Sequence, residues 1–260
     1  MSRTKIYTFL SCLVLAGAAF LLAQSQAHKR TPVPPQAYTL EYREGPVGDR
    51  QRNRIIAVRS DGSRVVMTAE SSPGYDGWDP KRLILPGERR RFLIAEKARL
   101  VSTYYLSPQE AERMALPTIS EKCLHDVGRG DQLVGEETIL GVKVYHYMGK
   151  SGRAGYTLES WNAPSLGCQS LQDVTTFTSD DGTSQRTFER VPLTLVLGEP
   201  DSKLFLPPDG FREVPPSEQQ KEVLGLIRGK PFGSVPKDER LLKGFESFDR
   251  GYNLAQKNRP

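Results

Sequence analysis

Few residues in this sequence have the type and spacing that nucleophilic or acid–base chemistry requires. Cys123 and His125 stand two positions apart in a polar stretch, and a cysteine beside a histidine can form a nucleophile–base pair. His146 alternates with Tyr145 and Tyr147, so on a strand its side chain would face away from both tyrosines. We interpret His146 as a solvent-facing or half-buried strand residue, and we expect Cys123 to form a disulfide rather than to act as a nucleophile.

The short motifs that mark common catalytic centres are absent from the sequence. There is no G-x-S-x-G elbow, no H-E-x-x-H pair and no phosphate-cradling G-x-x-x-x-G-K-[ST] loop. The acidic residues in Asp61-Gly62 and Asp180-Asp181-Gly182 are of the kind found in turns, and neither has the ligand spacing of a calcium loop. Glu136-Glu137 could supply a general base only with a partner that the sequence does not identify. We therefore predict no catalytic residue.

The N-terminal segment has the three-part pattern of a secretory signal peptide. Positive charge in the first five residues is followed by an apolar run over Ile6–Ala23 and by the small-residue sequence Ser25-Gln26-Ala27. The pattern predicts a signal peptide over residues 1–27 and export to the periplasm or the extracellular space. The alternative is an uncleaved anchor, because the run is near the lower length limit for spanning a bilayer. Only in that case would the chain contact a membrane.

An exported chain that keeps two cysteines, Cys123 and Cys168, is expected to join them in one disulfide. Two buried free thiols are the alternative. No C-x-x-C pair and no compact Cys/His set is present, so we predict no metal site and no cofactor.

The composition does not require a highly charged partner. The formal net charge is +5 over 260 residues, with 37% hydrophobic and 26% charged residues. Nucleic-acid binding requires a clustered basic face, and the densest basic run is Glu88-Arg89-Arg90-Arg91. We interpret that run as a solvated strand edge, with binding of phosphate or a lipid headgroup as the alternative. Nucleic acid is not an expected partner.

Alternating apolar and polar residues predict about ten short strands joined by turns. The runs at 54–59 and 64–68 flank an Asp-Gly turn, and those at 174–178 and 185–191 flank another. Ser107 is a predicted N-cap of a short helix that would end near Met114. The fold class expected is mainly β (α+β): a curled antiparallel sheet or half-barrel with a few packing helices.

Composition also divides the chain after the signal segment. Residues 28–36 form a proline-rich linker, residues 37–213 a β-rich domain, and residues 214–260 a C-terminal helical or flexible extension with Ser217 as a predicted N-cap. The extension carries an apolar stripe at helical spacing. The stripe either covers the sheet or docks on a partner protein. Its residues are Leu241, Leu242, Phe245, Phe248 and Tyr252.

Three stretches resemble a known family. They are Gly135–Tyr145, of the form G-x-E-x-[IV]-x-G; Glu159–Pro164, with Trp161; and Leu204–Phe211, which reads L-F-L-P-P-D-G-F. Between Gly135 and Phe211 the chain resembles exported proteins related to the Lol-type lipoprotein carriers. The resemblance implies an open sheet curled around a helix, a half-barrel whose concave side accepts acyl chains.

These observations lead to three hypotheses about function. The first is an exported, non-enzymatic binding protein for a lipid or another apolar ligand, with Tyr147, Trp161 and Phe205 as candidate lining residues. The second is a structural or interaction module of the cell envelope that docks a partner protein through its C-terminal extension. The third, an exported hydrolase, is the least favoured, because no catalytic arrangement can be assigned.

Overall fold

The computed structural model describes most of the chain outside the N-terminal segment. The described residues are 31–32, 36–49, 51–73, 75, 77, 79–115, 118–119, 122–123, 131–150, 154–227 and 252–259. The predicted signal peptide, most of the predicted linker, His125 and four residues of the apolar stripe (Leu241, Leu242, Phe245 and Phe248) lie outside them. Within the described part, no helix has the length and apolar character needed to cross a membrane.

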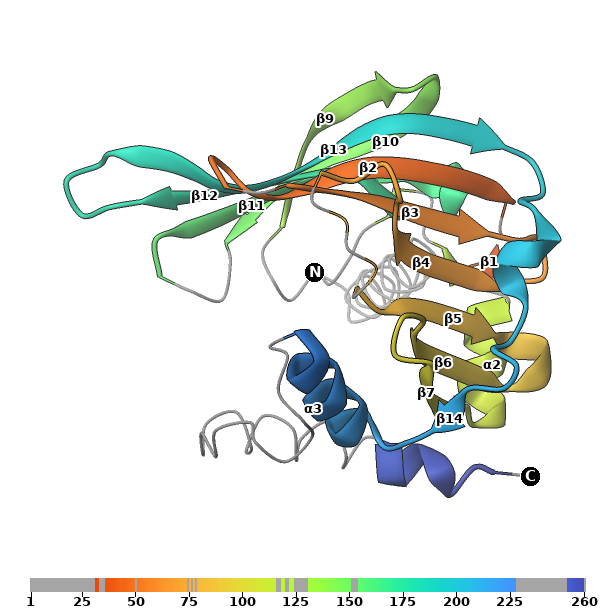
Figure 1. Cartoon of the computed structure of the whole chain (residues 1–260). Coiled ribbons are helices and arrows are strands. Elements are labelled where there is room, and N and C mark those ends of the chain that lie inside the picture. Colours follow the sequence, from red (N-terminus) through yellow and green to blue (C-terminus); the bar gives the residue numbers. More distant parts are fainter. Residues whose placement is uncertain are drawn as a thin grey trace, which may run out of the picture.

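A twelve-stranded sheet, curled but not closed, dominates the structure (Figure 1). Two antiparallel meanders build it. The first consists of β2 (Tyr38–Pro46), β3 (Arg52–Val58), β4 (Arg64–Thr68), β5 (Lys81–Leu85), β6 (Arg90–Ala95) and β7 (Leu100–Tyr105). The second consists of β9 (Gln132–Ile139), β10 (Val142–Lys150), β11 (Tyr156–Ala163), β12 (Gln169–Thr178) and β13 (Ser184–Leu197). Pairing of β13 with β2 joins the two meanders into one sheet.

The remaining elements lie around this sheet. The short strand β14 (Arg212–Glu213) pairs in parallel with β7, and β1 (Thr31–Pro32) pairs with β8 (Thr118–Ile119) as a separate two-stranded sheet. The helices are α2 (Pro108–Ala115) and α3 (Pro216–Ile227), with a further helical turn at 252–256; the 3₁₀ turns are η1 (Pro86–Glu88), η3 (Pro164–Leu166) and η4 (Ser202–Phe205). The predicted fold class, mainly β with a few packing helices, is confirmed.

Both predicted Asp-Gly turns are present and share one hydrogen-bond pattern. In the turn between β3 and β4, the carboxylate of Asp61 accepts from the backbone N–H of Ser63 at 2.8 Å. In the turn between β12 and β13, Asp181 accepts in the same way from Thr183 at 2.9 Å. Hydrogen bonds from Ser179 and Thr183 lower the pKa of Asp181. These carboxylates therefore stabilise turns, as the sequence indicates.

Two predicted element boundaries are wrong. The sequence suggests separate strands at 185–191 and 194–197, whereas β13 is continuous through Pro192, with a register shift against β2 between Pro192 and Thr194. Proline is tolerated there because β12 pairs with β13 only as far as Arg190, so no ladder bond from Pro192 to β12 is lost. Helix α3 begins at Pro216 rather than after Ser217, since proline favours the first helical position.

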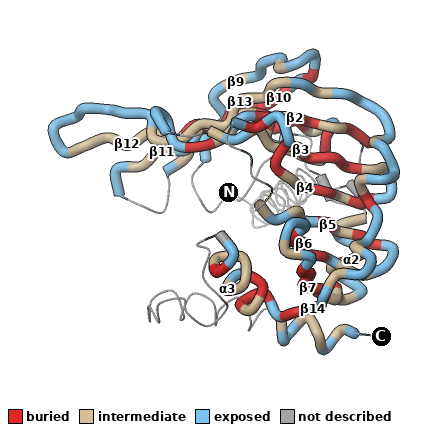
Figure 2. Tube along the Cα trace, in the orientation of Figure 1, coloured by how far each residue is buried: buried red, intermediate tan, exposed pale blue. Residues whose placement is uncertain are grey.

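The faces of the sheet carry two cores. We call the face that bears Tyr38, Leu40 and Tyr42 the inner face. The larger core consists of inner-face residues of β2 and β3 together with residues of β10–β12 and η3. The second core lies on the opposite face of β3–β7 and includes Val65, Leu83 and Phe205 of η4. Figure 2 shows burial concentrated along β2–β7, whereas the β12–β13 hairpin is mainly half-buried or exposed.

Helix α3 packs against strands β6 and β7 of the sheet. The Gln219 side chain is 3% exposed, and its amide donates to the carbonyl oxygens of Leu93 and Leu100 at 3.0 and 3.1 Å. Val223 packs against Ala95 and Leu100. Figure 1 shows α3 on the hollow side of the curled sheet.

The last described residues protect the exposed edge of β7. The side-chain amides of Gln256 and Asn258 donate to the carbonyl oxygens of Thr103 and Tyr105 at 2.6 and 3.3 Å. Such bonds satisfy edge carbonyls that could otherwise pair with another chain. Tyr252, the one member of the predicted stripe that is described, packs edge-to-face on Tyr104 with ring centroids 5.4 Å apart.

The predicted disulfide between Cys123 and Cys168 is present. It ties the segment that precedes β9 to the turn between η3 and β12, 45 residues further along the chain. The backbone N–H of Cys168 also donates to the carbonyl of Ala163 at 2.9 Å, which fixes that turn at the end of β11.

Candidate ligand site on the inner face

The middle of the inner face is a band of paired charges. Arg190 donates to Glu44 at 2.9 Å and to Asp173 at 2.8 Å, and Arg54 donates to Glu44 at 3.1 Å. These contacts follow from register, because Arg190 stands directly opposite Glu44 on β2 and Asp173 on β12. The Arg190 guanidinium also lies 4.7 Å from the centre of the Tyr42 ring. The band links four strands, β3, β2, β13 and β12, at the place where the two meanders meet.

The two carboxylates hold Arg190 in its charged form. Burial alone would lower the pKa of this guanidinium, but Asp173 and Glu44 offset the effect and leave the pKa raised. Since the charges are paired and hydrogen-bonded, the band can remain half-buried at low cost. Its role in the described structure is to hold strands together.

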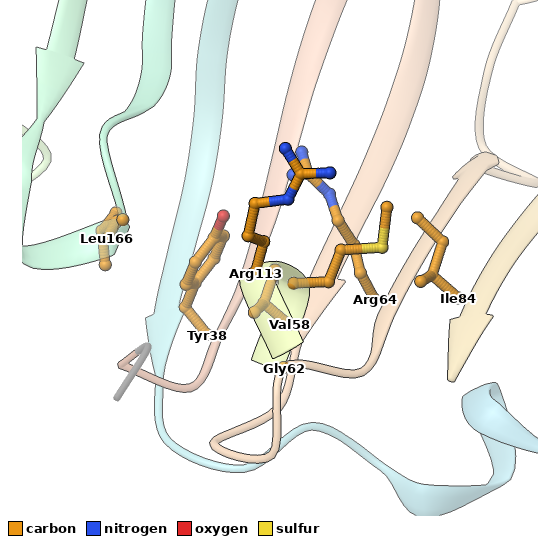
Figure 3. Close-up of a pocket in the computed structure, with 9 residues that line it drawn as sticks. Tyr38, Val58, Gly62, Arg64, Ile84, Arg113 and Leu166 are labelled. Carbon is orange, nitrogen blue, oxygen red and sulfur yellow. The ribbon is translucent and has the colours of Figure 1, made fainter. Parts of the chain in front are cut away.

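An apolar pocket of about 240 Å³ lies at the turn end of the same face (Figure 3). Its floor is a row of side chains brought together by strand register: Tyr38 opposes Val58, which opposes Arg64, which opposes Ile84. Leu166 of η3 lies at the Tyr38 end of this row, and Arg113 and Met114 of helix α2 also line the pocket. The full lining is Tyr38, Val58, Gly62, Arg64, Ile84, Arg113, Met114, Leu166 and Gly167.

Two polar groups at this pocket are positioned by Gln169. Its side-chain oxygen accepts from Arg64 at 2.7 Å and lies 3.4 Å from the Tyr38 hydroxyl, which donates to it. Burial raises the pKa of Tyr38 from 10.0 to about 12, despite the opposing effect of Arg64. The phenol is therefore neutral over the physiological range and acts as a hydrogen-bond donor.

This raised pKa predicts a loss of stability at high pH. Between pH 10 and pH 12 the unfolded chain loses the Tyr38 proton while the folded chain retains it, so the free energy of unfolding falls as pH rises through that window. The loss attributable to Tyr38 amounts to about 2 kcal/mol at pH 12. Urea unfolding at pH 9, 10, 11 and 12 should therefore show a smaller decline in Tyr38→Phe than in the wild type. Tyr156→Phe, which alters a half-buried tyrosine of β11, serves as control; equal declines in the Tyr38 variant and the wild type would contradict the prediction.

Beyond the charged band, the inner face becomes apolar again on the far part of β9–β13. Tyr147 opposes Leu133 on β9, and it shares its face with Leu158 on β11. Leu133 and Leu158 are 42% and 44% exposed. We call this surface the apolar wing; its members are Leu133, Tyr147, Tyr156, Leu158, Phe177 and Phe188. Apolar surface on the hollow side of an open sheet is available to a ligand.

The three predicted lining residues lie in different places. Tyr147 is buried in the apolar wing, with its hydroxyl donating to the carbonyl of Lys122. The side chain of Trp161 points to the side of β10–β11 that does not bear Tyr147. It belongs to the larger core, and its ring stacks on the His146 ring with centroids 4.0 Å apart. Phe205 is buried under η4 and lines a second pocket, of about 540 Å³, between α2, η1 and η4. The structure thus does not bring these three side chains together.

The residues that line the inner pocket are not among the ligand-lining residues predicted from the sequence. Val58 and Arg64 could have been paired from the Asp-Gly turn between them, since a hairpin fixes its own register. Arg113 and Leu166 carry no such local signal, because they reach the pocket through the position of α2 and η3 in the fold.

His146 is placed beside two carboxylates. Its Nε2 lies 3.0 Å from Glu159 and its Nδ1 3.6 Å from Glu137, which also accepts from the Trp161 indole at 3.1 Å. None of these residues lines either pocket described above. No group of three or more metal-ligating side chains occurs among the residues that the structure describes.

Comparisons with known proteins bear on the fold. No family model and no curated protein matches the chain. Among solved structures it is similar to an uncharacterised conserved protein from Thermus thermophilus, with a TM-score of 0.42, 11% identity, and coverage of 76% of this chain and 98% of that one. It is also similar to a chain of the Pseudomonas aeruginosa MucA/MucB complex, with a TM-score of 0.42, 15% identity, and coverage of 70% and 59%. A third is a LolA superfamily protein from Nitrosomonas europaea, with a TM-score of 0.28, 13% identity, and coverage of 71% and 97%. A protein of the Lol-type superfamily, to which the sequence shows a resemblance, is thus among the solved structures that this chain is similar to, at a low TM-score.

Proposed function

We propose that this chain is an exported, non-enzymatic binding protein that takes an apolar chain on the inner face of its curled sheet, in the periplasm or outside the cell. The observation that carries the proposal is the pocket floored by Tyr38, Val58 and Ile84. At about 240 Å³ it is slightly smaller than the roughly 300–1,000 Å³ of typical ligand sites. It therefore suits one end of a ligand, whose remainder would lie along the open hollow.

Two further features support a binding role over catalysis. The apolar wing leaves Leu133 and Leu158 exposed on the same face of the sheet as the pocket, which is the arrangement an extended apolar ligand requires. The one described histidine beside carboxylates, His146, does not line the pocket. The second hypothesis, docking through the C-terminal extension, has no comparable support in the described residues, because Tyr252, Gln256 and Asn258 all contact β7 of the same chain.

The proposal can be tested by titrating the purified chain with N-phenyl-1-naphthylamine, an uncharged probe that fluoresces in apolar surroundings. We expect saturable binding by the wild type. Ile84→Phe, which fills the pocket from its floor, should weaken binding about tenfold, since one buried aromatic ring displaces the probe from most of its contacts.

Ile55→Phe is the matched control. Ile55 is half-buried like Ile84, but it lies one residue from Ile56 and so faces the other side of the sheet. This variant should bind the probe as the wild type does. Absence of saturable binding, or equal affinity in Ile84→Phe and the wild type, would refute the pocket as a ligand site.

A further inference from the structure

Two arginines line the inner pocket. Arg64 reaches it from β4 and Arg113 from α2, and Figure 3 shows both side chains among the residues that line it. Arg64 is half-buried and Arg113 is exposed. Two like charges so placed repel each other unless an anion lies between them or water screens them.

Within the described part of the chain, these two arginines differ from Arg54 and Arg190 in forming no ion pair. Besides the hydrogen bonds from Ser107, the charge of Arg113 lowers the pKa of Glu110, one turn earlier on α2, without such a contact. Arg54 and Arg190 each form ion pairs with carboxylates of neighbouring strands. The contacts of Arg64 and Arg113 are with neutral acceptors: the side-chain oxygen of Gln169 at 2.7 Å and the carbonyl of Gln109 at 3.3 Å. Among the residues that the structure describes, neither takes part in a salt bridge.

Several donors of this pair therefore remain for a ligand. A guanidinium has five N–H donors, and each of these arginines uses one of its nitrogens in the contacts above. The planar guanidinium matches the oxygen atoms of a carboxylate or a phosphate. The Tyr38 hydroxyl and Gln169 add neutral polar groups at the same wall of the pocket.

We propose that the ligand is an anionic amphiphile, whose apolar chain occupies the pocket and whose carboxylate or phosphate head is bound between Arg64 and Arg113. This inference rests on the proposed function and specifies its ligand class. The apolar floor explains affinity for the chain, and the arginine pair explains selection of a charged head over a neutral one. Two elements far apart in the sequence supply the pair, so the site exists only in the folded protein.

The test compares three ligands of one chain length below their micelle concentrations: dodecanol, dodecanoate and dodecyl phosphate. Each is measured by displacement of N-phenyl-1-naphthylamine from the purified chain. We expect at least one anion to bind about tenfold or more tightly than dodecanol, as charge-assisted hydrogen bonds permit. A preference for dodecyl phosphate alone identifies a phosphate ester as the ligand, and equal preference identifies any single oxyanion head.

Substitutions test whether Arg64 and Arg113 cause the preference for an anionic head. Arg113→Gln changes an exposed side chain and should lower affinity for the anions much more than affinity for dodecanol; Arg64→Gln should act likewise. Arg82→Gln is the matched control, because Arg82 is an exposed arginine on the same face that does not line the pocket. An anion preference lost equally in Arg82→Gln would assign it to general surface charge and overturn the inference.

The outcomes separate this inference from the proposed function. If dodecanol binds as tightly as both anions, the apolar pocket stands and the arginine pair has no role in selection. If Arg113→Gln and Arg64→Gln both keep the wild-type preference, the head is bound elsewhere and the inference fails. If neither the probe nor any of the three ligands binds, the proposed function fails with it.

Discussion

Replacing Gly62 by alanine is expected to lower the free energy of unfolding by about 2–4 kcal/mol, the sum of a backbone and a packing cost. Gly62 has φ of +81°, in the left-handed region that alanine adopts only with strain. An added Cβ would lie 2.6 Å from both the Cα of Ala115 and the carbonyl oxygen of Met114. Because those atoms are backbone at the end of α2, the clash can be relieved only by moving the helix.

The second Asp-Gly turn provides a matched control. Gly182 has φ of +84°, and a Cβ there would have no atom within 4 Å. Gly182→Ala should therefore show only the backbone cost, about 1 kcal/mol, and the difference between the two variants measures the contact with α2. Urea unfolding of both variants gives the two values. Equal losses would mean that the helix yields without cost.

Displacement of α2 should also be visible at the pocket. Met114 and Arg113 form its wall on the helix side, so moving the helix changes the space that the probe occupies. We expect Gly62→Ala to alter N-phenyl-1-naphthylamine affinity and Gly182→Ala to leave it unchanged. That pair of results would show that the close contact between Gly62 and α2 sets the dimensions of the pocket.

The features that the sequence predicts correctly are those fixed by local chemistry. The Asp-Gly turns depend on residues two positions apart, and the start of α2 depends on a reciprocal pair in which Ser107 and Glu110 bond each other's backbone at 3.2 and 2.8 Å. The disulfide could be predicted because only two cysteines followed the apolar segment. In each case the partners were either close in sequence or few in number.

Long-range pairings could not be predicted in this way. The junction of β13 with β2 joins residues about 150 positions apart, and no local signal specifies it. Once that junction exists, Arg190 meets Glu44 and the charged band forms. The same limit explains why the sequence predicts Tyr147, Trp161 and Phe205 as one set. Each is an apolar strand-like position, but register and alternation place them on different surfaces.

The C-terminal extension shows why a deletion is a poor test of function. Removing residues 217–260 would take away Gln219, which satisfies carbonyls of β6 and β7, and the side chains that cap the β7 edge. Loss of binding in such a variant would reflect a damaged sheet. A single substitution, Tyr252→Ala, removes one aromatic contact with Tyr104 and leaves the buried amide in place.

Loss of the Cys123–Cys168 bond is expected to cost about 4 kcal/mol, from the entropy of the unfolded chain in a loop of 45 residues. The double variant Cys123→Ser/Cys168→Ser should unfold at a lower urea concentration, and its free energy of unfolding should be smaller by that amount. Dithiothreitol should shift the wild type to the same midpoint and leave the double variant unchanged. A shift under about 1 kcal/mol would show that the segment before β9 is held by other contacts.

The bond should matter for the pocket as well as for stability. Cys168 immediately precedes Gln169, which bonds Tyr38 and Arg64, and follows Leu166 and Gly167 of the pocket wall. Reduction frees this turn from its covalent tie, so probe affinity should fall under reducing conditions before the sheet itself unfolds. Because the charged band and the β13–β2 junction lie elsewhere, the fold can survive while the site loosens. If the reduced protein keeps both its fold and its full probe affinity, α2 is enough to maintain the pocket without the disulfide.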